Sequence, residues 1–140
     1  MTGSSPFNVL EMTFEMLSAE PRPLTIDGRR LGLGLPARQI PINELRSIVV
    51  HPTASHDLQS SIVDAVIGRL EQQRDPWVVV LGGLLLPGMR RLAEQLLVSG
   101  ERTPRFHVEA ELLSGLLLAI RCPPNDTHRY AMHLLGLARR

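Results

Sequence analysis

The chain has 140 residues, of which 44% are hydrophobic and 21% are charged, and its formal net charge is +1. These values exclude an intrinsically disordered chain and an overall electrostatic attraction to nucleic acid. They predict a single domain with a buried core. The only cysteine, Cys122, excludes an internal disulfide and suits a reducing cytoplasm.

All 15 basic residues are arginine, which is typical of proteins from GC-rich genomes such as those of actinobacteria. They are unevenly distributed, because residues 87–140 carry eight arginines against five acidic residues. The first residues lack the basic segment and apolar core of a signal peptide. No apolar run is long enough to span a bilayer. We therefore expect a cytoplasmic protein that binds no membrane.

An amphipathic helix is predicted over residues 6–19. Ser5 suits the capping position and Pro6 suits the first helical position. Phe7 and Phe14 recur at helical spacing, so both should lie on one apolar face that packs against a core.

Residues 24–31 are predicted to form a short β-hairpin. The Asp27-Gly28 pair supplies the positive φ angles that a tight turn between two strands demands. An isolated hairpin is only marginally stable, so this one should pack against helices. Two further helices are predicted, one within residues 40–50 and a longer one from 56 to about 73.

The longest apolar run begins at Trp77 and ends at Leu86. Residues 77–83 could form a buried strand, since β-branched residues are frequent from Trp77 to Leu81 and Gly82-Gly83 could turn the chain into a helix. The apolar spacing instead favours one helical face that continues beyond Pro87, with the proline ring directed at the turn that contains Gly83. We favour a kinked, buried helix, and the strand remains the alternative.

A second apolar helix is predicted over residues 108–121, packed antiparallel against the first. Its apolar side chains extend nearly all round the helix, which is more than one packing face needs. We therefore expect the surplus to be buried in a homodimer or against a partner protein, through Leu112, Leu113, Leu116 and Leu117. The whole chain should be mainly α, a compact helical bundle in which residues 6–76 cover a core of residues 77–140.

Candidate catalytic groups do not assemble in the sequence. Cys122 and His128 could form a nucleophile and base, but the two prolines after the thiol make an oriented pair improbable, and a lone cysteine is usually a small buried hydrophobe. The histidines are not spaced as helical metal ligands. Glu109 and Glu111 lie two residues apart and share no helix face, so we expect them to mark the acidic first turn of the helix predicted over residues 108–121. We expect no enzyme activity, no metal and no cofactor.

Three segments occur in an order that points to a known family. The segment from Leu86 to Leu97 begins with an apolar-Pro pair and continues with Arg-Arg-Leu-Ala, and the segment from Ala110 to Arg121 carries a glycine, a bulky pair and a terminal arginine. Thr127 begins the third, Thr-His-Arg-Tyr-Ala. Together these segments resemble the second domain of bacterial sigma factors, which binds the clamp of RNA polymerase and melts promoter DNA.

The chain departs from that family where the family holds the polymerase. The resemblance places Ala110, Glu111, Leu113 and Ser114 where sigma factors carry a polar clamp-binding cluster. It leaves Tyr130 as the only aromatic in the promoter-melting region, and we expect no second DNA-binding domain after residue 140. We therefore expect a shared fold without the housekeeping activity.

Two functional hypotheses follow. The first is a small non-enzymatic regulatory protein with a sigma-domain-like helical core, associated with transcription, DNA or RNA polymerase. Its contacts with phosphates or with a partner would be Arg90, Arg91, Arg102, Arg105, Arg129, Arg139 and Arg140, with Tyr130 as a stacking group. The alternative is a protein-interaction or oligomerisation module, antitoxin-like or a scaffold, that binds no nucleic acid.

Overall fold

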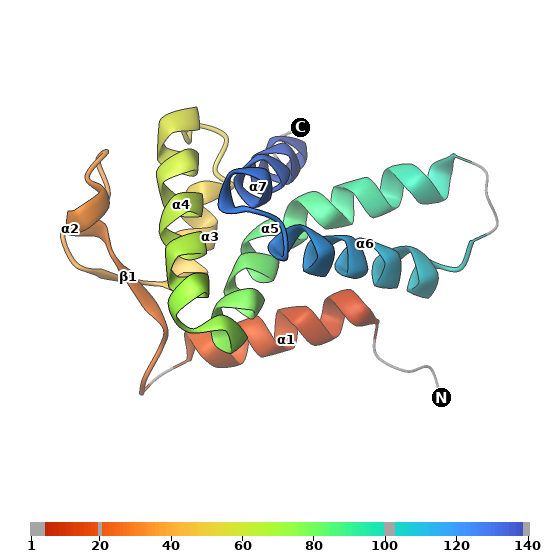
Figure 1. Ribbon diagram of the computed structural model, residues 1–140, viewed down its shortest axis with the longest axis horizontal. Coiled ribbons are helices and arrows are strands. Elements are labelled where there is room, and N and C mark those ends of the chain that lie inside the picture. The colour runs from red at the N-terminus through yellow and green to blue at the C-terminus, as the bar shows by residue number, and fades with distance from the viewer. Residues whose placement is uncertain (1–4, 20, 100–102, 139–140) are drawn as a thin grey trace.

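The computed structural model describes residues 5–19, 21–99 and 103–138. Its elements are α1 (Pro6–Ser18), β1 (Thr25–Asp27), α2 (Gly28–Leu31), β2 (Gln39–Pro41), α3 (Ile42–Val49), α4 (His56–Gln72), α5 (Arg74–Val98), α6 (Arg105–Ile120) and α7 (Pro124–Ala138). Figure 1 shows the helices gathered around α5, with the two short strands at one end of the molecule. The prediction of a mainly α fold with a small two-stranded sheet is confirmed.

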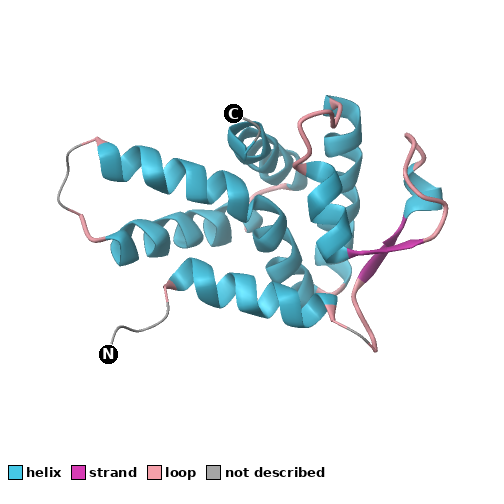
Figure 2. Ribbon diagram, turned by 180° about the vertical axis from the view of Figure 1, so that it is seen from behind, coloured by secondary structure: helices cyan, strands magenta, loops and turns pink. Residues whose placement is uncertain are grey.

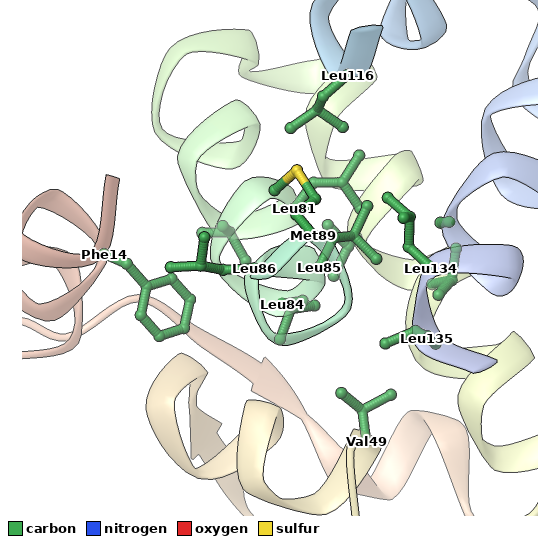
Figure 3. Packing of buried hydrophobic residues seen from close by; sticks show 14 of the residues in the cluster. Phe14, Val49, Leu81, Leu84, Leu85, Leu86, Met89, Leu116, Leu134 and Leu135 are labelled. Atoms are coloured by element: carbon green, nitrogen blue, oxygen red, sulfur yellow. The ribbon is translucent and has the colours of Figure 1, made fainter. Parts of the chain in front are cut away.

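Helix α5 is the centre of the fold, because α1, α3, α4, α6 and α7 all pack against it. The segment that the sequence left open as strand or helix, residues 77–83, is helical. Its buried side chains meet those of the surrounding helices, as Figure 3 shows for Phe14 on α1, Val49 on α3 and Leu134 on α7. A helix that is apolar on all sides is stable only in such a position.

The path of α5 bends near Pro87, between its green and its cyan parts in Figure 1. Proline has no N–H group, so the carbonyl of Gly83 loses its partner within the helix. Arg46 on α3 supplies a replacement, donating from Nη1 to that carbonyl at 3.2 Å. The ring of Phe14 on α1 occupies the space where a side chain at position 83 would lie, since a Cβ on Gly83 would overlap that ring. The predicted kink is thus held by two other helices.

Arg46 links three parts of the core. Its guanidinium donates to both carboxylate oxygens of Glu11 on α1, at 2.6 and 2.7 Å, and lies 4.3 Å from the centre of the Phe14 ring. The hydrogen bonds from Arg46 hold the pKa of Glu11 below its usual value. This cluster joins α1, α3 and the bend of α5.

The predicted hairpin is wrong in its second strand. Asp27 and Gly28 form no turn; Asp27 caps α2 by accepting a hydrogen bond from the Arg29 amide at 3.0 Å. Strand β1 pairs instead with β2 in antiparallel register, with Ile26 opposite Ile40. Gly28 has a packing role, because a Cβ there would overlap the carbonyl group of Pro36. The positive φ angles occur later, at residues 32–34.

The start of α1 is capped from two sides. Ser5 Oγ accepts from the amide of Asn8 at 3.0 Å, as the sequence predicted. Glu109 on α6 accepts from the amide of Phe7 at 3.1 Å. The prediction that Glu109 marks the acidic first turn of its helix is wrong, since α6 begins at Arg105. Glu109 is only 3% exposed. A carboxylate is stabilised there by the free amides and the dipole of a helix N-terminus.

In the described parts of the chain, no helix is long and apolar enough to cross a membrane.

Candidate functional site

The arginines predicted to form a binding surface are dispersed. Arg90 lies over the ring of Phe7 at 5.8 Å from its centre, and Arg105 pairs with Glu94 at 2.7 Å. Both guanidinium groups therefore have partners within the chain. Arg102, Arg139 and Arg140 lie outside the described residues.

Arg91 on α5 and Arg129 on α7 are exposed, and neither forms an ion pair with any residue that the structure describes. Arg129 lines an open depression on α7 together with Asp126, Tyr130 and His133. Tyr130 is half-buried there, and burial raises the pKa of its hydroxyl above the usual value. The depression thus combines a cation, an acid and an aromatic side chain, without an excess of positive charge.

The four leucines predicted to form an oligomer interface divide between the core and the surface. Leu116 is only 3% exposed and meets Gly82 of α5, so the prediction that it faces another chain is wrong. Leu112 and Leu113 are half-buried, and Leu117 is 52% exposed. Figure 3 shows Leu116 directed into the core from α6.

Sequence reasoning missed an exposed apolar stripe on α1. Val9, Met12 and Met16 are exposed and recur at helical spacing opposite the buried Phe7 and Phe14. The signal was present, because α1 carries apolar residues on both sides. On α6, Phe106 and Leu117 are exposed at positions that share one side of the helix with Leu113.

A serine, a histidine and an aspartate meet between α4 and α7. His128 Nε2 lies 3.0 Å from Ser60 Oγ and 3.5 Å from Asp64 Oδ1. A catalytic triad needs the carboxylate on the other ring nitrogen, where it orients the imidazole. Here both partners share Nε2, so the cluster links two helices and lacks the geometry that activates a nucleophile.

Cys122 is exposed, and its thiol donates to the carbonyl of Leu118 at 3.5 Å. Among the described residues, no group of three or more histidine, cysteine, aspartate or glutamate side chains is placed to hold a metal ion. Within that part of the chain, the exposed apolar stripes of α1 and α6 are therefore the strongest candidate for a binding site.

No family model matches the chain. No curated protein and no solved structure matches it either. The resemblance to the second domain of sigma factors thus rests on the three quoted segments alone.

Proposed function

We propose that this chain is a non-enzymatic regulatory protein that acts by binding another polypeptide through one apolar surface. That surface, the α1/α6 face, consists of Val9, Met12, Met16, Phe106, Leu113 and Leu117. The observation that carries the proposal is the exposure of five of these side chains, beside Leu113, which is half-buried and packs against the core.

The packing of α1 on α6 places both stripes on one side. Figures 1 and 2 show the two helices side by side and running in the same direction. They touch through the Phe7 amide and Glu109, and Leu10 and Leu116 both lie against Gly82 of α5. Because these inward positions fix the rotation of each helix, the remaining apolar positions of both are directed away from α5. We propose that the stripes, which lie on two helices in contact, form one continuous face.

Contiguous exposed apolar surface of this kind is typical of sites that bind proteins. Methionine is suited to such a site, because its unbranched, polarisable side chain adapts to different partners. The arginines predicted to bind phosphates are a weaker candidate surface, since Arg90 and Arg105 already contact Phe7 and Glu94 within the chain. A partner protein therefore fits the described surface better than duplex DNA does.

Site-specific photo-crosslinking in the native host tests this proposal. A photoreactive amino acid at position 16, where Met16 is 74% exposed, should form covalent adducts with another polypeptide. The matched control is position 33, because Leu33 is exposed on a loop distant in sequence from both helices. Adducts that are absent, or equally frequent at both positions, would overturn the proposal.

A second candidate is the sigma-domain-like role, in which α7 contacts nucleic acid or RNA polymerase. The depression that brings Arg129 beside Tyr130 favours it, because a guanidinium can bind phosphate while an aromatic ring stacks on a base. Affinity for DNA should then fall by ~0.9 log unit per log unit of salt for each duplex phosphate contacted. Replacing Arg91 and Arg129 by alanine should flatten that slope, whereas absent or salt-insensitive binding would exclude this role.

A further inference from the structure

We propose that the polypeptide bound by the α1/α6 face is a second copy of this chain, in a two-fold symmetric dimer. This inference rests on the function proposed above and names the partner. The uncharged centre of the face, the exposure of its side chains and the rigid packing behind it all favour a second copy.

Charged side chains lie on the two outer flanks and leave the centre of the face uncharged. On α1, Glu11 is paired with Arg46 of α3, and Glu15 lies one helical turn further along the same side. On α6, Glu111 lies at a groove toward α5, beside Leu96 and Leu112. The apolar stripes lie between these flanks.

An uncharged face suits self-association. A two-fold interface places the same surface patch on both subunits, so any unpaired charge near its centre approaches its own copy. Like charges brought together in this way cost several kcal/mol. A face adapted to a charged partner would carry the opposite charge, and the α1/α6 face carries none.

The face can supply the apolar centre of a dimer interface. Five of its six side chains are at least half exposed, and a standard interface buries about 800 Å² on each partner. The neighbouring small and polar residues, such as Thr13, Ala110 and Ser114, supply a rim around this centre. Two copies can therefore cover the face fully, without any change in the fold.

Rigid-body docking is sufficient, because the residues that hold α1 and α6 together are buried. Glu109 is fixed by the amide of Phe7, and Phe14 by the gap at Gly83. The face is thus preformed in one chain, and association does not require ordering of either helix.

Sedimentation velocity on the purified protein at micromolar concentration tests the inference. The expected species has twice the chain mass of 15.5 kDa. Met16→Glu should weaken dimerisation by at least about 30-fold, since each dimer would bury two glutamates. The matched control is Val98→Glu, at a site 81% exposed near the end of α5, which should leave the dimer unchanged.

Met12→Glu provides an independent variant on the same face, and circular dichroism confirms that each variant is folded. A monomer at every concentration would overturn the inference, as would a dimer that neither Met12→Glu nor Met16→Glu weakens. Crosslinks from position 16 to a different protein, combined with a monomer, would retain the proposed function and reject the second copy. The two proposals therefore fail separately.

Discussion

The two halves of α5 have opposite environments within one continuous helix. From Trp77 to Met89 most side chains are buried, whereas from Arg90 to Val98 only Ala93 is buried. The difference arises at the bend near Pro87. Before it, α5 runs through the middle of the bundle; after it, α5 and α6 project together as an antiparallel hairpin (Figures 1 and 2). The direction of the backbone, more than its apolar content, decides which half becomes core.

The largest loss of stability is expected from a substitution in the buried first half of α5, at the point where α7 contacts its backbone. A Cβ on Gly88 would overlap the backbone carbonyl of Leu134, so Gly88→Ala must displace α7. We expect a loss of about 3 kcal/mol or more in the free energy of unfolding, measured by urea denaturation. Gly68→Ala is the control, because nothing lies within 4 Å of a Cβ at that exposed helical site. It should stabilise the protein by about 0.5–1 kcal/mol.

The next largest difference is expected between two ion pairs. The Arg46–Glu11 pair beside the bend of α5 should stabilise the fold more than the exposed Arg105–Glu94 pair. Arg46→Met leaves the Gly83 carbonyl and the Glu11 carboxylate without their partner, which should cost about 2–4 kcal/mol. Arg105→Met removes the exposed pair with Glu94 on the projecting hairpin, and the thermal midpoint should not change measurably. Equal losses of stability in Arg46→Met and Arg105→Met would show that the two ion pairs contribute alike.

A pH titration of stability sharpens the same contrast. Hydrogen bonds from Arg46 depress the pKa of Glu11 in the folded state, so its contribution is present above the unfolded pKa of about 4.3. That contribution is lost as the pH falls through the folded pKa. Between about pH 5 and pH 3, the wild type should therefore lose more stability than Glu11→Gln. Parallel curves for the two proteins would show that the pair contributes nothing.

The smallest effect is expected at the tip of the hairpin. Val98→Ser removes apolar surface that is already in water, so the free energy of unfolding should change by less than about 0.5 kcal/mol. Leu85→Ser, a buried site in the first half, is the matched comparison and should cost several times more by the same measurement. A large loss at Val98 would mean that the projecting half is covered by another chain.

Local signals predicted the helices well. Ser5 and Ser55 occupy the capping positions of α1 and α4, and each accepts a hydrogen bond from an amide three residues later. Periodicity placed the last residues of α1, α3, α4 and α6 to within one residue, but α6 begins three residues before its predicted start and no bounds were predicted for α7. Caps and apolar periodicity depend only on residues close together in the chain, so they can be recognised in a single sequence.

Features that depend on distant contacts could not be predicted. Strand β1 pairs with β2, and α2 and a loop lie between the two strands in the sequence. No turn signal near Asp27 predicts a connection of that length. The burial of Glu109 depends on an amide of α1. For an apolar helix such as α6, periodicity does not determine which leucines face inward; contact with Gly82 places Leu116 in the core and leaves Leu117 outside.

The hydrogen bond from Phe7 to Glu109 joins residues 102 positions apart, and this separation has a consequence during synthesis. At about 5–20 residues per second, α1 is made roughly 5–20 s before its partner on α6. Until α5 and α6 have been made, the nascent chain presents an amphipathic helix with Phe7 and Phe14 uncovered. The early end of the chain is therefore where a ribosome-bound chaperone would find apolar surface, and α1 joins the core only when α5 and α6 have emerged.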